Sequence, residues 1–160
     1  YQCMERVPAP SEDSEQSTAP CLTILRPAGI YGPGRVPNWQ ALREQKPLAV
    51  DPDSRLNLVH QADLVDTIVE LSEGPHGTEL FCVSDNAPPT RREYYQWIAQ
   101  LGNLPGPIFE PSSNSRGTRM ESNKRICSDR LFQRLGRSFR FPTYKQGLAD
   151  VFRSIPEFNR

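Results

Sequence analysis

TILRPAGIYGPGR, residues 23–35, is the most informative stretch of this 160-residue chain. It begins inside a short apolar run, residues 21–25, whose aliphatic and β-branched side chains predict a buried strand. Pro27 cannot donate a ladder hydrogen bond, so regular pairing should stop there. Residues 32–34, Gly-Pro-Gly, predict a tight and exposed bend. A strand that ends in a loop rich in Gly and Pro is a typical ligand position in an open α/β sheet.

The rest of the chain alternates strand-like and helix-like segments. Thr90 and Glu93 form a capping box, and Gly136 follows a helical run as a stop signal. Residues 1–20 are polar and rich in Pro, Ser and Glu, which predicts a loop or disorder. The pattern predicts strands over about residues 57–60 and 79–84, and helices over about residues 38–45, 64–72, 91–101, 129–135 and 143–154.

Alternating strands and helices indicate an α/β fold, and 160 residues are one domain's worth of chain. Only two convincing long-range strands are present, at residues 21–25 and 79–84. Two strands cannot form a stable doubly wound sheet alone, and their edges and apolar faces would be exposed to water. We expect one structured region over residues 21–155.

Composition narrows the class of protein. Hydrophobic residues make up 36% of the chain and sixteen residues are proline, which predicts a loop-rich fold. No apolar run approaches the roughly 20 residues of a membrane span, and the N-terminus lacks the pattern of a secretory signal. The four cysteines include no CxxC pair and the two histidines are distant, so free thiols are favoured over disulfides or a metal site. These features predict a cytoplasmic protein without a metal and without a membrane partner.

Charge is unevenly distributed although the net charge is zero. Residues 1–109 carry eight Lys and Arg against fourteen Asp and Glu, whereas residues 110–160 carry eleven against five. This distribution predicts either mutual attraction between the two parts or a basic surface for an anionic ligand. Solvated arginines on two helices are the third alternative.

With these segments placed, the chain resembles the C-terminal half of the extended short-chain dehydrogenase/reductases, also called NAD-dependent epimerase/dehydratases. The resemblance runs in the family's order over roughly residues 21–150. Four segments carry it. LRPAGIYGPGR (25–35) is similar to the loop after the family's sixth strand, and NLVHQAD (57–63) is similar to a short strand and the start of the following helix. FCVSD (81–85) is similar to a late Rossmann strand, and NKRI (123–126), LG (135–136) and PTYKQGL (142–148) are together similar to a C-terminal signature of one subgroup.

The resemblance implies the C-terminal part of a Rossmann-like NAD(P)-binding fold with the family's small substrate domain. Family enzymes transfer hydride on a sugar or a similar hydroxyl or carbonyl compound. They bind the dinucleotide pyrophosphate at a GxxGxxG turn and move a proton with a Tyr-x-x-x-Lys pair. Residues 1–20 contain neither, since Tyr1 is followed by Glu5 where a lysine would be needed. We therefore expect a truncated oxidoreductase without the N-terminal βαβ half, without a catalytic residue of its own, and without turnover alone.

The resemblance also implies cofactor-binding residues. It places the backbone groups of Pro27, Ala28, Gly29 and Ile30 against the nicotinamide amide of NAD or NADP. The alternative is a plain strand exit with no ligand. Many relatives carry Asn at the position of Gly29, where the side chain contacts substrate, so Gly29 weakens the expectation of nucleotide-sugar binding.

The substrate-binding residues implied by the resemblance are Tyr31, Arg35, Lys124 and Arg125. Arg35 would hold a carboxylate or phosphate through its two-pronged guanidinium. The alternative for Tyr31 and Arg35 is a packed tyrosine beside a surface arginine, with no ligand. The alternative for Lys124 and Arg125 is that they belong to the segment that connects to the last helical region, with no ligand.

His60 and Asp63 have the side chains of an acid–base pair. Structural roles are favoured for both: a backbone hydrogen bond at the strand–helix turn for His60, and a position at the helix N-terminus for Asp63, where a carboxylate is stabilised.

The expected partner is a small molecule of the nucleotide-sugar type, with a homodimer as an open alternative. A rival function keeps the fold without the chemistry, as a degenerate family member that acts as a protein-interaction module. Nucleic-acid binding through the basic C-terminal third is the second rival and would fall steeply with salt. The zero net charge and the lack of an interleaved basic and aromatic motif disfavour it.

Overall fold

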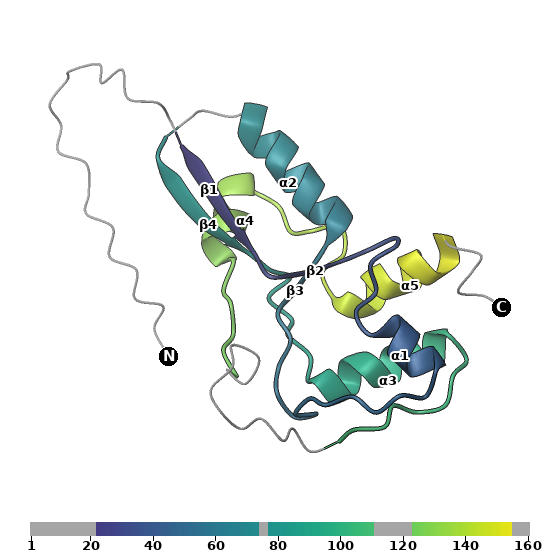
Figure 1. Cartoon of the computed structure of the whole chain (residues 1–160). Helices are drawn as coiled ribbons and strands as arrows, with labels where there is room; N and C mark the ends of the chain where they lie inside the picture. Colours follow the sequence, from purple (N-terminus) through teal and green to yellow (C-terminus); the bar gives the residue numbers. More distant parts are fainter. Residues whose placement is uncertain (1–21, 74–76, 111–122, 155–160) are drawn as a thin grey trace, which may run out of the picture.

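The structure is a computed structural model that describes residues 22–73, 77–110 and 123–154. Two small parallel sheets and five helices make up this part of the chain (Figure 1). One sheet pairs β1 (Thr23–Pro27) with β4 (Glu79–Val83), and the other pairs β2 (Gly29–Tyr31) with β3 (Leu58–His60). The helices are α1 (Trp39–Arg43), α2 (Gln61–Glu73), α3 (Arg91–Leu101), α4 (Asp129–Leu135) and α5 (Tyr144–Ser154). The predicted α/β class is confirmed, while the expectation for residues 1–20 lies outside the described residues.

The chain passes from the first sheet to the second at Ala28. β1 ends at Pro27, as predicted from the missing N–H. The N–H of Ala28 donates to Val83 O in the first sheet at 2.9 Å, and the N–H of Gly29 donates to Asn57 O beside the second sheet at 3.0 Å. The stretch expected to be only a loop therefore contains a strand, β2. The sequence hid it because three residues between a proline and a Gly-Pro-Gly bend carry no visible periodicity.

The bend itself forms as predicted. Gly32 and Arg35 exchange both backbone hydrogen bonds, at 3.1 and 2.9 Å, and Gly34 between them has φ +76°. A left-handed φ of this kind favours glycine.

Two apolar clusters lie on the two sheets. The first joins β1 and β4 to α2, α4, one residue of β3 and the segment after α4, and its buried members are Val59, Leu71, Phe81, Val83, Leu131 and Phe139. The second joins β2 and β3 to α1, α3 and α5, and its buried members are Tyr31, Leu42, Leu48, Leu58, Tyr94, Tyr95, Ile98, Tyr144, Leu148 and Phe152. Figure 1 shows the corresponding separation into two groups of elements.

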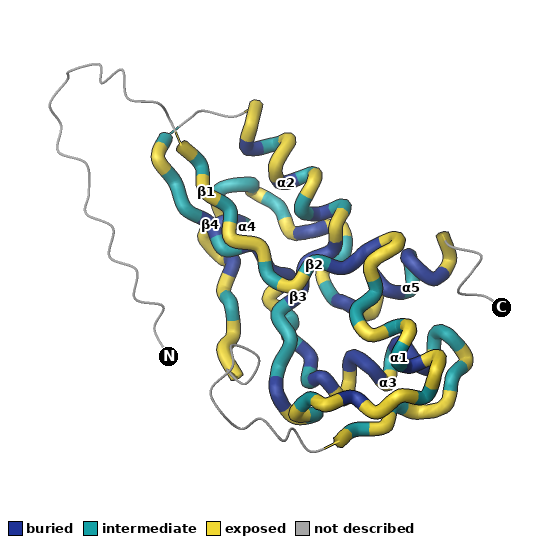
Figure 2. The backbone as a smooth tube through the Cα atoms, in the orientation of Figure 1, coloured by how far each residue is buried: buried dark blue, intermediate teal, exposed yellow. Residues whose placement is uncertain are grey.

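The prediction that the first strand is buried is wrong. No residue of β1 is fully buried, and Ile24 is 40% exposed (Figure 2). The reason is that β1 belongs to a sheet of only two strands among the described residues, and only the face that carries Leu25 packs against the first cluster.

The apolar residues of α2 are only partly buried. Val65, Ile68 and Val69 are each about half exposed, while Asp63, Thr67 and Leu71 are buried. The apolar periodicity identified the helix correctly but not the side of it that packs within the described part of the chain.

Helix boundaries agree well with the local signals. The capping box at α3 is present: Glu93 N–H donates to Thr90 Oγ1 at 3.2 Å, and Thr90 N–H donates to the Glu93 carboxylate at 2.7 Å. α4 begins after Ser128 and ends at Gly136, whose φ is +67°. The Ser128 hydroxyl does not cap α4, however, because it accepts a hydrogen bond from the buried Ser84 N–H at 2.8 Å.

Ion pairs join the basic C-terminal part to earlier acidic residues. They are Arg134–Glu79 at 3.3 Å, Arg137–Glu70 at 2.7 Å and Arg140–Asp66 at 3.2 Å. For this segment the structure therefore supports attraction between the acidic and the basic part of the chain. The three arginines already have carboxylate partners and so do not form an unpaired basic surface.

Cys82 is half-buried and Cys127 is exposed, and neither of these two cysteines is in a disulfide. The predictions for Cys3 and Cys21 lie outside the described residues. Within the described ranges, no three or more His, Cys, Asp or Glu side chains gather where a metal ion would bind. None of the described helices is long and apolar enough to cross a membrane.

Candidate functional site

Asn57 joins two groups of residues that are far apart in the sequence. Its backbone oxygen accepts the hydrogen bond from Gly29 N–H at 3.0 Å. Its side-chain amide donates to Lys124 O at 2.8 Å and accepts from Ile126 N–H at 2.7 Å. The structure thereby brings the predicted cofactor loop, residues 27–30, next to the predicted substrate residue Lys124.

Space around the cofactor loop is limited. A Cβ on Gly29 would lie 3.1 Å from Asn57 O and 3.3 Å from Leu58 Cδ2, so a side chain here requires these neighbours to shift by a few tenths of an ångström. The N–H groups of Ala28 and Gly29 are both bonded within the protein, and Pro27 has no N–H. These three residues therefore offer no free backbone donor to a nicotinamide amide. Ile30 is half-buried against the first apolar cluster.

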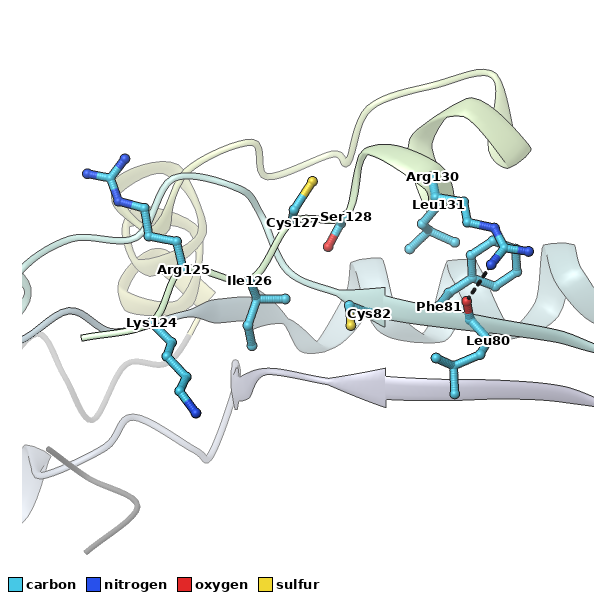
Figure 3. Close-up of a pocket in the computed structure, with 10 residues that line it drawn as sticks. All are labelled: Leu80, Phe81, Cys82, Lys124, Arg125, Ile126, Cys127, Ser128, Arg130 and Leu131. Carbon is cyan, nitrogen blue, oxygen red and sulfur yellow. Dashed lines mark hydrogen bonds between the residues drawn. The ribbon is translucent and has the colours of Figure 1, made fainter. Parts of the chain in front are cut away.

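Lys124 and Arg125 lie at the rim of a hollow of about 270 Å³ beside β4 (Figure 3). The two side chains point to opposite sides of an extended segment, as neighbouring residues of extended backbone do. Ile126 and Leu80 contribute to the apolar wall. Arg130 forms another wall, where its guanidinium donates to Leu80 O at 3.5 Å and lies 5.3 Å from the centre of the Phe81 ring. Cations above an apolar floor suit a ligand that has an anionic group and an apolar body.

Tyr31 does not face this hollow. Its side chain is 0% exposed in the second apolar cluster, and its ring meets the His60 ring edge-on at 5.2 Å. Burial, with the nearby carboxylates of Asp85 and Asp63, raises the pKa of the hydroxyl. The structure therefore gives Tyr31 the packing role that the sequence left open. Tyr31 is excluded from the substrate site because a fully buried side chain is out of reach of a ligand.

Arg35 lies at the exposed Gly-Pro-Gly bend and does not line the hollow. Its side chain has no ion pair with the described part of the chain. The four predicted substrate residues are therefore not gathered into one site: Lys124 and Arg125 lie together, Arg35 lies at the bend, and Tyr31 lies in the core.

His60 and Asp63 take the structural roles that the sequence favoured. His60 Nδ1 accepts a hydrogen bond from Ala62 N–H at 3.2 Å, and burial lowers the pKa of its ring. The buried Asp63 carboxylate accepts from Arg140 N–H at 2.7 Å and from Phe141 N–H at 3.1 Å. Asp63 therefore holds the segment that leads into α5.

Asn57 and Asp85 had no predicted role, and the structure places both in key positions. Asp85 follows β4, is 7% exposed, and accepts a hydrogen bond from Ala87 N–H at 3.0 Å. Burial raises its pKa to about 6. Both residues lie inside motifs quoted above, next to strand ends, and that position is the one sequence signal that could have found them.

Replacing Asn57 by alanine should destabilise the fold by about 1–3 kcal/mol, because Lys124 O and Ile126 N–H lose their partner. Urea unfolding measures the loss. Asn57→Asp is a second variant: it keeps the acceptor for Ile126 but sets a carboxylate oxygen against Lys124 O, so it should also destabilise the fold. Equal stability of Asn57→Ala and the unchanged chain would contradict the link.

No family model matches the chain. In sequence it is similar to protein YeeZ of Escherichia coli K12, with 32% identity over 121 residues. That match covers 76% of this chain and 41% of YeeZ.

Solved structures settle the fold. UDP-glucose 4-epimerase of Thermotoga maritima, solved with UDP-glucose, matches with a TM-score of 0.68 and 16% identity over 86% of this chain. A Methylobacillus flagellatus protein, provisionally described as an NAD-dependent epimerase/dehydratase, matches with a TM-score of 0.61 and 27% identity over 82% of this chain. The chain has the fold of the C-terminal half of an NAD-dependent epimerase/dehydratase. MoeE5, solved with UDP-glucuronic acid and NAD, matches it likewise, with a TM-score of 0.65, 19% identity and 86% coverage.

The epimerase/dehydratase fold confirms the family resemblance that the four sequence segments predicted. The chain spans less than half of each of these proteins: 47% of the T. maritima enzyme and 46% of both the M. flagellatus protein and MoeE5.

Proposed function

We propose that this chain is the substrate-domain part of an NAD(P)-dependent oxidoreductase that acts on a nucleotide sugar or a similar hydroxyl or carbonyl compound. The observation that carries the proposal is the Asn57 link, which brings residues 27–30 and Lys124 together in an epimerase/dehydratase fold. Two of the matching structures were solved with UDP-glucose or with UDP-glucuronic acid and NAD.

In this proposal Lys124 and Arg125 support the anionic part of the substrate at the rim of the hollow, while Arg35 lies apart at the Gly-Pro-Gly bend. The loop at residues 27–30 borders the nicotinamide, which supplies or accepts the hydride when bound. The 160 residues contain no GxxGxxG turn and no Tyr-x-x-x-Lys pair. In this proposal they border only the nicotinamide end of the dinucleotide.

A titration with NADH tests the cofactor part. The 160-residue chain alone should show no saturable change in nicotinamide fluorescence and no turnover, because it lacks a pyrophosphate-binding turn. The T. maritima epimerase is the positive control for the assay. Tight, saturable binding by the chain alone would contradict this expectation.

A titration with UDP-glucose, followed by amide chemical shifts, tests the substrate part. Shifts should concentrate on residues 124–131, and Lys124→Ala should reduce them strongly. Lys46→Ala, a lysine outside the hollow, is the matched control and should leave them unchanged. A shift pattern that avoids this segment, or that survives Lys124→Ala, would remove the proposed substrate site.

A second candidate function is an interaction module without chemistry. The half-exposed apolar side chains on β1 and α2 favour it over nucleic-acid binding. The ion pairs of Arg134, Arg137 and Arg140 disfavour nucleic-acid binding, because these cations already have carboxylate partners.

A further inference from the structure

A second hollow lies between α3 and α5, which pack against each other (Figure 1). Its volume is about 430 Å³, within the range of small-molecule sites. It shares no lining residue with the hollow beside β4. Trp97 of α3 and Phe141, which precedes α5, give it aromatic walls. This hollow, which we call the α3–α5 hollow, is therefore separate from the proposed substrate site.

One side of α5 brings two cations to the α3–α5 hollow. Lys145, Ala149 and Arg153 follow one another at intervals of four residues, so they lie along the same side of the helix. The small side chain of Ala149 leaves space between the two long ones. Neither Lys145 nor Arg153 forms an ion pair with a residue that the structure describes. Lys145 Nζ lies 5.3 Å from the centre of the Trp97 ring, a contact that holds the ammonium group at the wall.

The segment before α5 is fixed where it borders the hollow. The buried Asp63 carboxylate accepts from the N–H groups of Arg140 and Phe141, and the Phe141 ring lies 4.2 Å from the His60 ring. Arg140 Nη2 is held by Asp66 at 3.2 Å, and the guanidinium has further N–H groups to offer a ligand. Side chains that are held in place before binding lose less entropy when a ligand arrives.

Asp150 is the single carboxylate among the described residues that line the hollow. Its carboxylate repels a bare anion and accepts a hydrogen bond from a hydroxyl group. A ligand that suits all of these groups has an anionic group for the cations and hydroxyl groups for Asp150. Its carbon skeleton would pack against Trp97 and Phe141.

We propose that the α3–α5 hollow binds a phosphate ester of a small polyhydroxyl compound, such as a sugar phosphate. The phosphate lies between Lys145 and Arg153, with Arg140 at the edge, and a hydroxyl group donates to Asp150. A phosphate is favoured over a carboxylate because two unpaired cations balance its two charges. This site goes beyond the proposed function, since it uses neither the nicotinamide loop nor the hollow beside β4.

Amide chemical shifts of the 160-residue chain test the proposal in three titrations: glucose 6-phosphate, inorganic phosphate and glucose. Glucose 6-phosphate should shift Trp97 and residues 140–153, with a Kd below about 1 mM. Inorganic phosphate should bind at the same residues at least about tenfold more weakly, because it lacks the carbon skeleton and its hydroxyl groups. Glucose should show no saturable binding, because it lacks the anionic group.

Lys145→Ala and Arg153→Ala should each weaken binding of glucose 6-phosphate by at least about tenfold, since each removes a charge-assisted hydrogen bond. Both residues are exposed, and unchanged circular dichroism shows that the variants are folded. Arg43→Ala is the matched control: Arg43 is an exposed cation 6.0 Å from the centre of the Trp39 ring and lies outside the hollow. It should leave binding unchanged.

Asp150→Asn separates recognition of the hydroxyl group from attraction of the phosphate. Loss of the carboxylate charge should strengthen the binding of inorganic phosphate, while the preference for glucose 6-phosphate over inorganic phosphate should fall. A purely structural role of Asp150 would change neither affinity.

Absence of saturable binding, shifts outside the hollow, or binding that survives both alanine variants of the cations would overturn the site. Equal affinities for glucose 6-phosphate and inorganic phosphate, or an Asp150→Asn chain that keeps the full preference, would overturn the ligand class. The UDP-glucose titration reports on residues 124–131 instead, so failure of the proposed function leaves this result intact.

Discussion

Gly147→Ala should lower the free energy of unfolding by about 3 kcal/mol, at the upper end of the cost of overpacking a core. Gly147 lies in α5, and a Cβ there would lie within contact distance of the Tyr31 ring, closest to its hydroxyl oxygen and 2.9 Å from Cε2 and Cζ. In an exposed helix the same change stabilises by roughly 0.5–1 kcal/mol. The sign reverses here because Tyr31 is fully buried and has no space to retreat. Urea unfolding gives the value.

A double-mutant cycle with Tyr31→Phe isolates the contact. Tyr31→Phe alone should be neutral or slightly stabilising, because the buried hydroxyl has no hydrogen-bond partner in the described structure. Combined with Gly147→Ala it should recover part of the loss, since the closest contact disappears with the hydroxyl. Gly106→Ala is the control and should change little, because a Cβ added at Gly106 would have nothing within 4 Å. A Gly147→Ala chain as stable as the original would refute the packing of Tyr31.

Asp85→Asn should stabilise the fold at neutral pH and above. Burial raises the pKa of Asp85 from 3.8 to about 6, which corresponds to about 3 kcal/mol between the two protonation states. Because the pKa is higher in the folded than in the unfolded state, the carboxyl makes its full contribution to stability below about pH 4, where it is protonated in both states. This contribution is lost as pH rises through about 6. Asparagine keeps the acceptor for Ala87 N–H and never acquires the charge.

The measurement is urea unfolding of both chains between pH 5 and pH 8. The advantage of Asp85→Asn should grow by about 1–2 kcal/mol over this range. Burial lowers the pKa of His60, so this residue also makes the stability depend on pH. His60 is present in both chains, and its contribution therefore cancels in the difference between their free energies of unfolding. Asp53→Asn, at a side chain that is 77% exposed, is the control and should leave the pH profile unchanged. A constant difference between Asp85→Asn and the original chain across the range would show that folding does not raise the pKa of Asp85.

Local signals predicted the elements whose boundaries depend on a few neighbouring residues. The Thr90–Glu93 capping box marked the start of α3, Gly136 the end of α4, and Pro27 the end of β1. Each acts within one turn of helix or one strand residue, so the sequence around it contains all the information that the backbone uses.

Long-range relations were beyond the same signals. The sequence places Asn57 before a strand, but not against residues 124–126, because no local pattern reports a hydrogen bond across 67 residues. The apolar periodicity of α2 includes Ile68, Val69 and Leu71, but of these three only Leu71 is buried in the described structure.

By itself, the sequence determined the α/β class, most helix boundaries and the family to which the four segments point. The tertiary structure alone decided that Tyr31 is a core residue, that Asn57 joins the loop at residues 27–30 to Lys124, and that β1 keeps an open edge among the described residues. The physical reason is that turns, caps and periodicity act between neighbours in the chain, whereas burial and strand pairing depend on which distant segments come to lie beside them.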